Sequence, residues 1–446
     1  MGAFLGVTAV SYGIPRVALA KRPECNNRID DDGDSKVDYP ADPGCTNRGD
    51  KSEVDSVPPP PESPTLEAVD GGPNYYAQFS NPLPPDKFPV GAWLVCLDAG
   101  TLSVEPEKSK GINVYIAPCR TGSNIPPLID AGGMKMIAQD DWLDFLSSIG
   151  SETAAWMGLD EIDMVRDPAQ GCEELQQTKA TLPLNGRFFY NNFAKGVNFW
   201  ETDAEAACYI SVPDVISSDE YWFSDNNVCS PSEGGNKPGV ITSNNCHVAA
   251  NYGWTVQRNR GLVSPPGSKP MWNFVEVACP YGDDGWPCIT PTQMRAAVWH
   301  SLIAGARGIE YFIHSFKGTS GCGSSSNVLR DPCYSEQQAM VTSVNAEIQS
   351  LAGVLESPKL TSGFSASGGV RTVAKWDGSN FYVFAGAVPG AASETFSIPC
   401  VGNATATVVG ESRSVPVVAG AFTDSFAYSD SVHIYRIDGG STCGLM

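Results

Sequence analysis

Basic residues are scarce in this sequence. There are 29 Lys and Arg against 50 Asp and Glu, which gives a formal net charge of −21 at pH 7. No cluster of Lys or Arg offsets this acidity locally. Because an acidic surface repels phosphate backbones and anionic lipids, the composition excludes nucleic acid as a partner.

Histidine and long apolar segments are scarce as well. The chain has 4 His in 446 residues, which argues against a three-His metal centre and hence against a metal-dependent deacetylase or amidase. No stretch reaches the roughly 18–20 apolar residues that a membrane-spanning helix requires. We therefore expect a protein without a membrane span.

The N-terminus is apolar but short. Residues 3–14 are apolar, and residues 17–20 (VALA) place small side chains at the positions that a signal peptidase prefers. We expect residues 1–20 to be a signal peptide and the mature protein to be secreted.

Cysteine, in contrast, is abundant. The sequence has 14 Cys, none of them in a C-x-x-C arrangement. Several lie close together along the chain, namely Cys25 and Cys45, Cys229 and Cys246, Cys279 and Cys288, and Cys322 and Cys333. This usage favours disulfides that staple loops in an oxidising compartment over buried free thiols, although spacing leaves the connectivity open.

The chain divides by composition into four parts after the signal peptide. Residues 21–55 are acidic and bounded by Cys, and residues 56–73 form a Pro-rich linker. Residues 74–358 alternate β-rich runs with helical patterns, which is typical of a parallel α/β fold. Residues 359–446 contain short β-runs separated by Gly, Ser and Asn turns, which indicates a small antiparallel β-sandwich.

Eight strands are expected in the α/β part. Their predicted ranges are 89–94, 113–117, 135–139, 153–158, 187–191, 215–218, 271–275 and 309–313. The clearest helix, residues 290–306, opens with Thr290-Pro291, an N-cap followed by Pro at the first helical position. A doubly wound sheet would carry a Gly-rich phosphate loop after its first strand, and none is present. Eight strands in about 285 residues therefore predict a (β/α)₈ TIM barrel.

Two glutamates stand where barrel strands end. The fourth predicted strand runs into Asp160-Glu161, and the seventh ends at Glu276. The carboxyl ends of barrel strands gather at one face, where catalytic groups sit. Glycoside hydrolysis requires two carboxyl groups across the scissile bond. We predict Glu161 and Glu276 as that pair.

A Glu after strand four and another after strand seven resemble clan A of the glycoside hydrolases over residues 85–358. The resemblance implies that Glu161 is the acid/base and Glu276 the nucleophile, with net retention and no catalytic cofactor. It also implies an extracellular polysaccharide or glycoconjugate as substrate. Asp160 departs from the clan, which usually has Asn there, and an ionised Asp cannot donate a hydrogen bond. A non-catalytic carbohydrate-binding or surface-attachment protein on the same scaffold is the alternative.

Further sugar-binding candidates follow other strand ends, because sugar sites combine polar side chains with aromatic platforms. They are Gln139, Asp140, Asn191, Asp219, Tyr221, Trp222, Trp272 and His314, together with Asp160. For Tyr221 and Trp222 the alternative is packing in the core.

The acidic segment near the N-terminus has the spacing of a calcium loop. Asp30, Asp32, Asp34 and Asp38 stand at alternating or near-alternating positions, and the Lys36 carbonyl would join them. We expect a structural Ca²⁺ bound there, the alternative being a solvated acidic tether.

Overall fold

The computed structural model describes residues 22–54, 63–98, 102–225, 227–230, 246–281 and 287–445. The predicted signal peptide, residues 1–20, and residues 56–62 of the predicted linker lie outside these ranges. The chain forms two compact units, residues 1–60 and residues 61–446.

The small unit is held by a disulfide and a buried carboxylate. Its described part, residues 22–54, contains one short 3-10 helix, Glu24–Asn26, beside the Cys25–Cys45 disulfide. Glu53 is fully buried, and its carboxylate accepts hydrogen bonds from the amides of Asp31 and Asp38 at 2.8 and 3.0 Å. These two hydrogen bonds connect the acidic segment around Asp31 and Asp38 to Glu53, near the end of the described part of the unit.

The large unit contains a closed barrel of eight parallel strands, as the sequence predicts. Each strand lies within two residues of its predicted range. The strands are β2 (Val90–Trp93), β3 (Val114–Ile116), β4 (Lys135–Ala138), β5 (Thr153–Met157), β6 (Phe188–Phe193), β7 (Val215–Ser218), β8 (Met271–Glu276) and β9 (Gly308–Phe312).

Alternate residues of these strands face the inside and the outside of the barrel. Trp93, Met157, Phe188 and Trp272 pack in one cluster inside it. The opposite faces pack against the surrounding helices in the largest apolar cluster. Because both faces are buried, the strands read in sequence as nearly continuous apolar runs, which is why their positions are predictable.

Helices cover the barrel. They are α1 (Glu105–Lys108), α2 (Ile125–Ala131), α3 (Ile162–Val165), α4 (Pro168–Thr181), α5 (Asp203–Ser211), α6 (Ala250–Leu262), α7 (Pro291–Ile303), α8 (Ser335–Ser350) and α9 (Ala352–Leu355). Helix α7 begins as predicted, with Thr290 and Gln293 forming a reciprocal capping box. It ends before the predicted residue 306, since Gly305 has a φ of +102°.

Shorter helical turns connect these elements. They are the 3-10 helices Tyr75–Gln78, Asp140–Ser148, Asn227–Cys229, Pro332–Tyr334, Pro399–Val401 and Gly440–Cys443, and a π-helix, Gly196–Trp200. None of the helices in the described part of the chain is long and apolar enough to cross a membrane.

The C-terminal part is a β-sandwich, again as predicted. One sheet has the strand order β1-β10-β12-β13-β18-β15-β16 and the other has the order β11-β14-β17. The strands are β1 (Leu66–Glu67), β10 (Lys359–Leu360), β11 (Ser365–Ala366), β12 (Val370–Trp376), β13 (Asn380–Ala387), β14 (Ser393–Ser397), β15 (Ala404–Val408), β16 (Arg413–Val417), β17 (Ala421–Ser425) and β18 (Val432–Asp438). Strand β1 comes from the predicted linker, where Leu66 pairs with Leu360.

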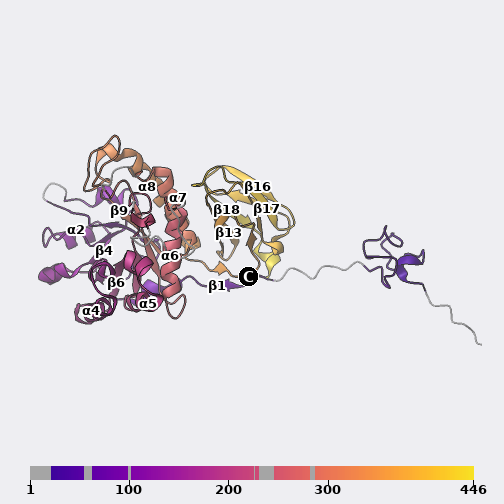
Figure 1. Cartoon of the computed structure of the whole chain (residues 1–446), viewed down its shortest axis with the longest axis horizontal. Coiled ribbons are helices and arrows are strands. Elements are labelled where there is room, and N and C mark those ends of the chain that lie inside the picture. The colour runs from indigo at the N-terminus through magenta and orange to yellow at the C-terminus, as the bar shows by residue number, and fades with distance from the viewer. Residues whose placement is uncertain are drawn as a thin grey trace, which may run out of the picture. The chain divides into compact units, whose positions relative to one another are not determined.

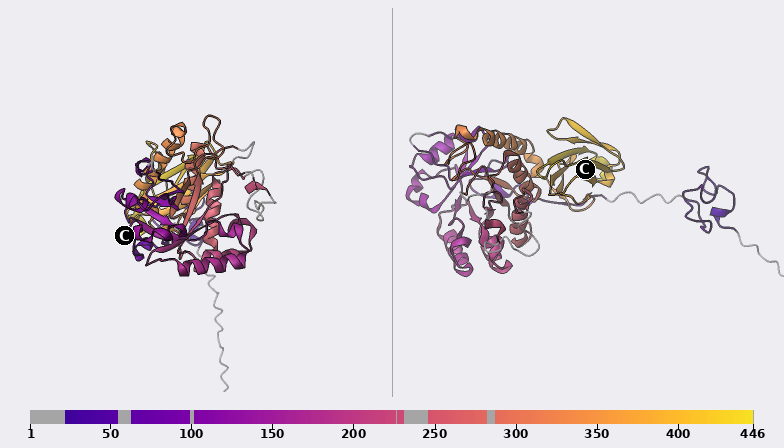
Figure 2. Two further views of the ribbon diagram at one scale, coloured as in Figure 1. Left: turned by 90° about the vertical axis from the view of Figure 1, so that its left-hand side faces the viewer. Right: turned by 45° about the horizontal axis from the view of Figure 1, so that its top comes forward.

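The sandwich lies beside helices α6 and α7 of the barrel (Figure 1 and Figure 2). The Trp299 ring on α7 stacks on Phe384 of β13, with centroids 5.8 Å apart. The buried His300 next to it donates from Nε2 to the Ala387 carbonyl at 3.0 Å. The Gly386 backbone approaches the same ring so closely that a Cβ there would lie 2.7 Å from its Cε1. The barrel and the sandwich therefore pack closely against each other around Trp299 and His300.

All 14 cysteines are paired in seven disulfides. Four of these join the pairs that lie close in sequence. The other three are Cys96–Cys119, Cys172–Cys208 and Cys400–Cys443. Four disulfides, Cys96–Cys119, Cys229–Cys246, Cys279–Cys288 and Cys322–Cys333, close segments that follow barrel strands, so they belong to the face where the strands end.

Candidate active site

Glu161 lies at the exit of β5 in a left-handed backbone conformation. Its φ is +47°, and it caps α3, which begins at the next residue. Leu94 and Ala117, which follow β2 and β3, also have positive φ values. A left-handed residue turns the chain sharply away from the strand. At Glu161 this turn leaves the side chain half-buried at the rim of the barrel.

Three carboxyl groups and one amide form a cluster at the exits of β5, β6 and β7. Asn192, at 1% exposure, donates from Nδ2 to Asp160 at 3.1 Å and to Asp219 at 3.2 Å. The Asp219 carboxyl also shares a hydrogen bond with Glu161. We refer to Asp160, Glu161, Asp219 and Asn192 as the exit cluster.

The electrostatics of the exit cluster favour protonated carboxyls. Burial, followed by the charges of Glu161 and Asp160, raises the pKa of Asp219 well above its usual range. Burial and the charge of Glu161 raise the pKa of Asp160 to about 7, against the hydrogen bond from Asn192. The cluster therefore holds a proton near neutral pH.

An aromatic cavity adjoins the cluster. It has a volume of about 350 Å³ and is lined by Glu161, Tyr221, Pro280, Tyr281, Phe312 and Phe316. Tyr221 packs its ring 5.3 Å from Tyr281 and 5.0 Å from Phe312. Burial, followed by the charge of Asp219, raises the pKa of its hydroxyl well above the usual range. His314 stacks on Phe316 at this edge, with centroids 5.7 Å apart, and burial lowers its pKa. Sugar-binding sites combine aromatic side chains with a few polar groups, and this cavity has both.

Glu276, at the end of β8, is fully buried. Its carboxylate accepts hydrogen bonds from the Phe223 and Ser224 amides at 2.9 and 3.2 Å, and from the Tyr252 hydroxyl at 2.6 Å. Burial raises its pKa to about 7, against the opposing effect of these donors. Glu276 is thus held rigidly, without exposed surface of its own.

A further carboxyl lies inside the barrel. Glu310 on β9 is fully buried and accepts hydrogen bonds from Tyr190 at 2.7 Å and from Ser217 at 2.8 Å. Burial raises its pKa to about 8, and the charge of Asp160 adds to the shift, which indicates that Glu310 lies close to the exit cluster. Its role is not predictable from the sequence, since a Glu within a buried strand has no distinguishing pattern.

The other sequence-predicted sugar-binding residues lie in several places. Trp222 and Trp272 have no exposed surface, and their indole nitrogens donate to Thr255 and Tyr76. Asn191 is fully buried and donates to the Leu159 and Asn192 carbonyls. Gln139 and Asp140 stand at the start of the 3-10 helix after β4, half-buried and exposed. Of the predicted set, Asp160, Glu161, Asp219, Tyr221 and His314 lie at the cluster or at the edge of the cavity.

Two residues of the site, Asn192 and Tyr281, are not among the predicted sugar-binding residues given above. Asn192 rather than Asn191 belongs to the exit cluster, because alternation along β6 turns Asn192 to the same side as the buried Tyr190. Applying that alternation to the sequence would have found it. Tyr281 follows β8 within a loop, and no local pattern distinguishes it from other loop aromatics.

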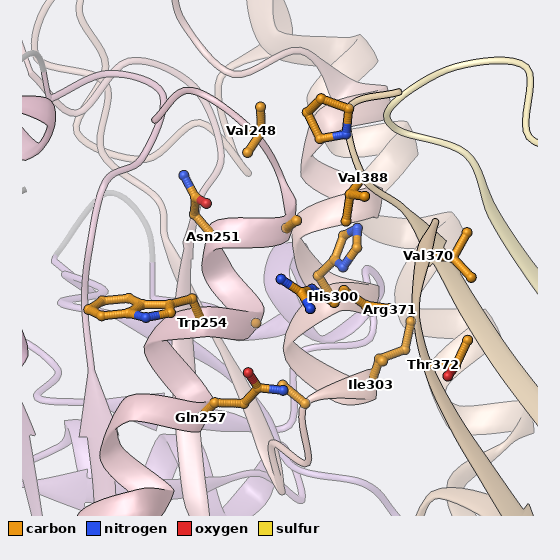
Figure 3. A pocket seen from close by; sticks show the side chains of 14 residues that line it. Val248, Asn251, Trp254, Gln257, His300, Ile303, Val370, Arg371, Thr372 and Val388 are labelled. Carbon is orange, nitrogen blue, oxygen red and sulfur yellow. The ribbon is translucent and has the colours of Figure 1, made fainter. Parts of the chain in front are cut away.

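A larger cavity, about 570 Å³, lies at the junction of barrel and sandwich. Figure 3 shows the His300 ring and the Arg371 guanidinium close together in it, with α6 residues such as Trp254 on one side. Burial lowers the pKa of His300 to about 4, so the ring is neutral near pH 7. The described lining residues include no Asp or Glu. Because this cavity lacks an acid/base pair, the candidate active site is the exit cluster.

In the small unit, three of the predicted calcium ligands converge. Carboxylate oxygens of Asp30, Asp32 and Asp34 lie within 4.8 Å of one another, which suits a cation with hard oxygen ligands. The ammonium group of Lys36 contacts Asp34 at 3.0 Å. The Asp38 carboxylate is not part of this group and accepts hydrogen bonds from the amides of Asn27 and Arg28. The three converging carboxylates fit a calcium ion.

Known structures share this architecture. A protein described as a glycoside hydrolase has a TM-score of 0.51 and 13% identity, covering 85% of this chain and 97% of its own. A glycoside hydrolase family 5 protein from Bacteroides vulgatus has a TM-score of 0.50 and 14% identity, covering 81% and 91%. No family model and no curated protein matches the sequence. The chain thus has the (β/α)₈ barrel and C-terminal sandwich found among glycoside hydrolases of known structure.

Proposed function

We propose that this protein is a secreted, retaining glycoside hydrolase that acts on an extracellular polysaccharide or glycoconjugate. The observation that carries the proposal is the exit cluster, in which the buried Asp219 lies with the half-buried Asp160 and Glu161 beside an aromatic cavity at the strand ends. Such a pairing of one acid with one carboxylate is what glycoside hydrolysis requires. Seven disulfides and the predicted signal peptide support secretion.

Asp219 and Glu161 are the pair that the geometry favours. The raised pKa of Asp219 suits the acid, which gives a proton to the glycosidic oxygen as the bond to C1 breaks. The Glu161 carboxylate attacks C1, and water then releases the sugar with Asp219 acting as base. Retaining enzymes hold the two carboxyls about 5–5.5 Å apart and inverting enzymes about 6.5–9.5 Å, so neighbouring carboxyls are nearer to the retaining arrangement. This proximity supports retention.

The clan A resemblance gives a different pair, Glu161 as acid/base and Glu276 as nucleophile. Full burial of Glu276 beneath Phe223, Ser224 and Tyr252 argues for a supporting role, in which its carboxylate fixes the loop after β7. That loop also carries Tyr221 of the cavity. The assignment of Glu276 as the nucleophile is a different prediction from the pair of Asp219 and Glu161, and azide trapping distinguishes the two.

The experiment begins with a broad polysaccharide panel and reducing-end detection. Separate Glu161→Gln and Asp219→Asn variants should lose at least about 100-fold in kcat/KM, the usual scale of a lost acid/base or nucleophile. Near wild-type rates in both variants would reject the pair. Failure of the wild-type protein to release product from any glycan that it binds would favour the non-catalytic alternative.

Azide trapping on an activated substrate assigns the roles. Azide should rescue Glu161→Ala with inverted anomeric configuration and Asp219→Ala with retained configuration, because azide takes the place of the nucleophile in one and attacks the glycosyl-enzyme in the other. The clan A assignment instead predicts a retained product from Glu161→Ala and an inverted one from Glu276→Ala.

We also propose that the small unit binds a structural Ca²⁺ through Asp30, Asp32 and Asp34, with the Lys36 carbonyl as a further ligand. The convergence of the three carboxylates supports this site. Calorimetric titration of the full chain with CaCl₂ should give one binding event that Asp32→Asn weakens. A flat titration would support the solvated tether instead. The ligands belong to a separate unit of the chain, and we expect the ion to take no part in the chemistry, so chelation should leave hydrolysis unchanged.

A further inference from the structure

Arg371 lines the cavity of about 570 Å³ at the junction of barrel and sandwich, which we call the junction cavity. Its side chain is exposed, and no carboxylate among the residues that the structure describes forms an ion pair with it. Every other Arg described within residues 63–445 contacts an Asp, a Glu or a backbone carbonyl. In a protein with a net charge of −21, a guanidinium without an acidic partner indicates a site for an anion.

The position of Arg371 follows from the alternation of side chains along β12. Arg371, Val373 and Lys375 lie on the side of the strand that faces the barrel. Val373 packs against the apolar cluster of the barrel, and the Lys375 ammonium donates to the carbonyls of Leu355 and Ser357 at 2.8 Å. Figure 3 shows the guanidinium of Arg371, in contrast, extending from the sandwich toward α6 in the cavity. The fold therefore places a cation in the cavity without using it to join the sandwich to the barrel.

The wall of the junction cavity on α6 carries a neutral amide and an aromatic ring. Gln257 is exposed there, and Trp254 is half-buried. Phe199 stacks on the Trp254 indole, with centroids 5.3 Å apart and an interplanar angle of 6°, which fixes the orientation of that ring. The buried His300 is neutral near pH 7, so it neither attracts nor repels an anion. Arg371 is thus the only charged group of the described lining at that pH.

We propose that the junction cavity is a second glycan-binding site, which takes the carboxylate of a uronic acid residue. The planar fork of the Arg371 guanidinium matches a carboxylate through two parallel hydrogen bonds. The hydroxyl groups and the apolar ring face of the same sugar suit Gln257 and Trp254. The choice of a saccharide rests on the proposed function, whereas the choice of an anion rests on Arg371. The junction cavity shares no lining residue with the aromatic cavity at Glu161, so the catalytic groups take no part in this binding.

Other occupants fit this cavity less well. A phosphate monoester carries a charge of about −1.5 to −2 at pH 7, which exceeds the single cation. A polyanion is repelled by the net charge of −21. A neutral sugar leaves the guanidinium without an anionic partner. A simple carboxylate such as acetate makes no use of Trp254 and Gln257, and it fills little of a cavity whose volume lies within the roughly 300–1,000 Å³ of small-molecule sites.

The test compares sugars that differ in the presence of a carboxylate. Glucuronate and galacturonate are titrated against the full chain at about pH 7 by saturation-transfer NMR, with glucose, galactose, glucose 6-sulfate and acetate as comparisons. At least one uronate should bind about 10-fold more tightly than its neutral counterpart and than acetate, because a charge-assisted pair is added. About 0.5 M NaCl should remove most of that preference. Equal binding of uronates and neutral sugars, equal binding of acetate, or tighter binding of the sulfate ester would overturn the inference.

Three variants locate the binding. Arg371→Gln should abolish the preference for the uronate. Gln257→Glu adds a carboxylate to the α6 wall and should abolish it too, without removing the cation. Arg436→Gln is the matched control, since it removes an exposed Arg of β18 that does not line the cavity, and it should keep the preference. A preference that survives Arg371→Gln, or one that all three variants lose equally, would overturn the inference.

Hydrolysis measured in parallel separates this inference from the proposed function. The wild-type protein is assayed for reducing-end release from neutral polysaccharides and from polysaccharides that contain uronic acid residues. Hydrolysis of any of them without a preference for uronate binding contradicts only the inference. Uronate binding that requires Arg371, without hydrolysis of any glycan, contradicts only the proposed function.

Discussion

The hydroxyl of Tyr252, on α6, donates to Oε1 of Glu276, at the end of β8, at 2.6 Å. The amides of Phe223 and Ser224 donate to the same carboxylate. One buried side chain thereby joins the loop after β7, the strand β8 and the helix between them. The shape of the cavity near Tyr221 depends on this junction, because Tyr221 belongs to the same loop.

Removing the Tyr252 hydroxyl should therefore destabilise the fold. In Tyr252→Phe, Glu276 loses a donor while remaining buried, so the free energy of unfolding in urea should fall by about 1–3 kcal/mol. Tyr428→Phe is the control, since Tyr428 is 77% exposed and its change should stay within about 0.5 kcal/mol. Equal stability of the two variants would show that the carboxylate does not depend on this donor.

Buried carboxyls should make the protein less stable as the pH rises. Burial raises the pKa of Glu310 to about 8 in the fold, above the ordinary value of about 4.5 in the unfolded chain. The stability from its neutral form is fully present below about pH 4.5 and is lost as the pH rises through about 8. Glu310→Gln should reduce the fall in unfolding free energy between these limits, by up to about 1.4 kcal/mol per pH unit.

The control for this pH dependence is Glu336→Gln, which changes an exposed residue on α8. Urea unfolding at several pH values should give this variant the slope of the wild-type protein. A Glu310→Gln profile parallel to the wild type would mean that Glu310 does not titrate differently in the folded and unfolded states.

Two disulfides should have separable roles. Cys172–Cys208 joins α4 to α5, and its replacement by two serines should cost about 4 kcal/mol of stability by the loop-entropy relation, with little change in kcat/KM. Cys279–Cys288 closes a shorter loop that carries Tyr281, so its removal should cost about 2.5 kcal/mol and mainly impair hydrolysis. Urea unfolding and kinetics measured on both variants check this, and a reversed order would contradict it.

Gly386 should be required at the contact between barrel and sandwich. A Cβ there would lie 2.7 Å from Cε1 of His300, so Gly386→Ala should lower the unfolding free energy by about 1–3 kcal/mol. Combining it with His300→Ala should cost less than the sum of the two single changes, because the clash disappears. Gly353→Ala, where nothing lies within 4 Å of the added atom, should be neutral or stabilising.

The barrel was predictable because its strands are buried on both faces, while the sandwich was only partly so. Strands β16 and β17 have weak sequence signals, since Arg413–Val417 alternates polar residues with a Pro and Ala421–Ser425 is largely polar. Strand β1 has two residues and pairs with β10 almost 300 residues later. Neither feature leaves a local periodic signal.

The catalytic candidates illustrate the same limit. A strand-end position identified Glu161 and Asp219 individually, because each follows an apolar run. Their hydrogen bond joins the ends of strands that are not adjacent in the barrel, and that proximity follows from closure of the sheet rather than from spacing along the chain. The burial of Glu276 likewise depends on Tyr252, whose approach from α6 has no signature in the sequence.

Four of the disulfides close segments that begin at the end of a barrel strand. Three of them, Cys229–Cys246, Cys279–Cys288 and Cys322–Cys333, each close a single segment upon itself. Each of these disulfides holds the two ends of its segment at a fixed spacing, whichever residues lie between them. One such segment can therefore be exchanged at a time, by evolution or by design, to change which ligands the aromatic cavity accepts. The strands and helices of the barrel then keep their sequence.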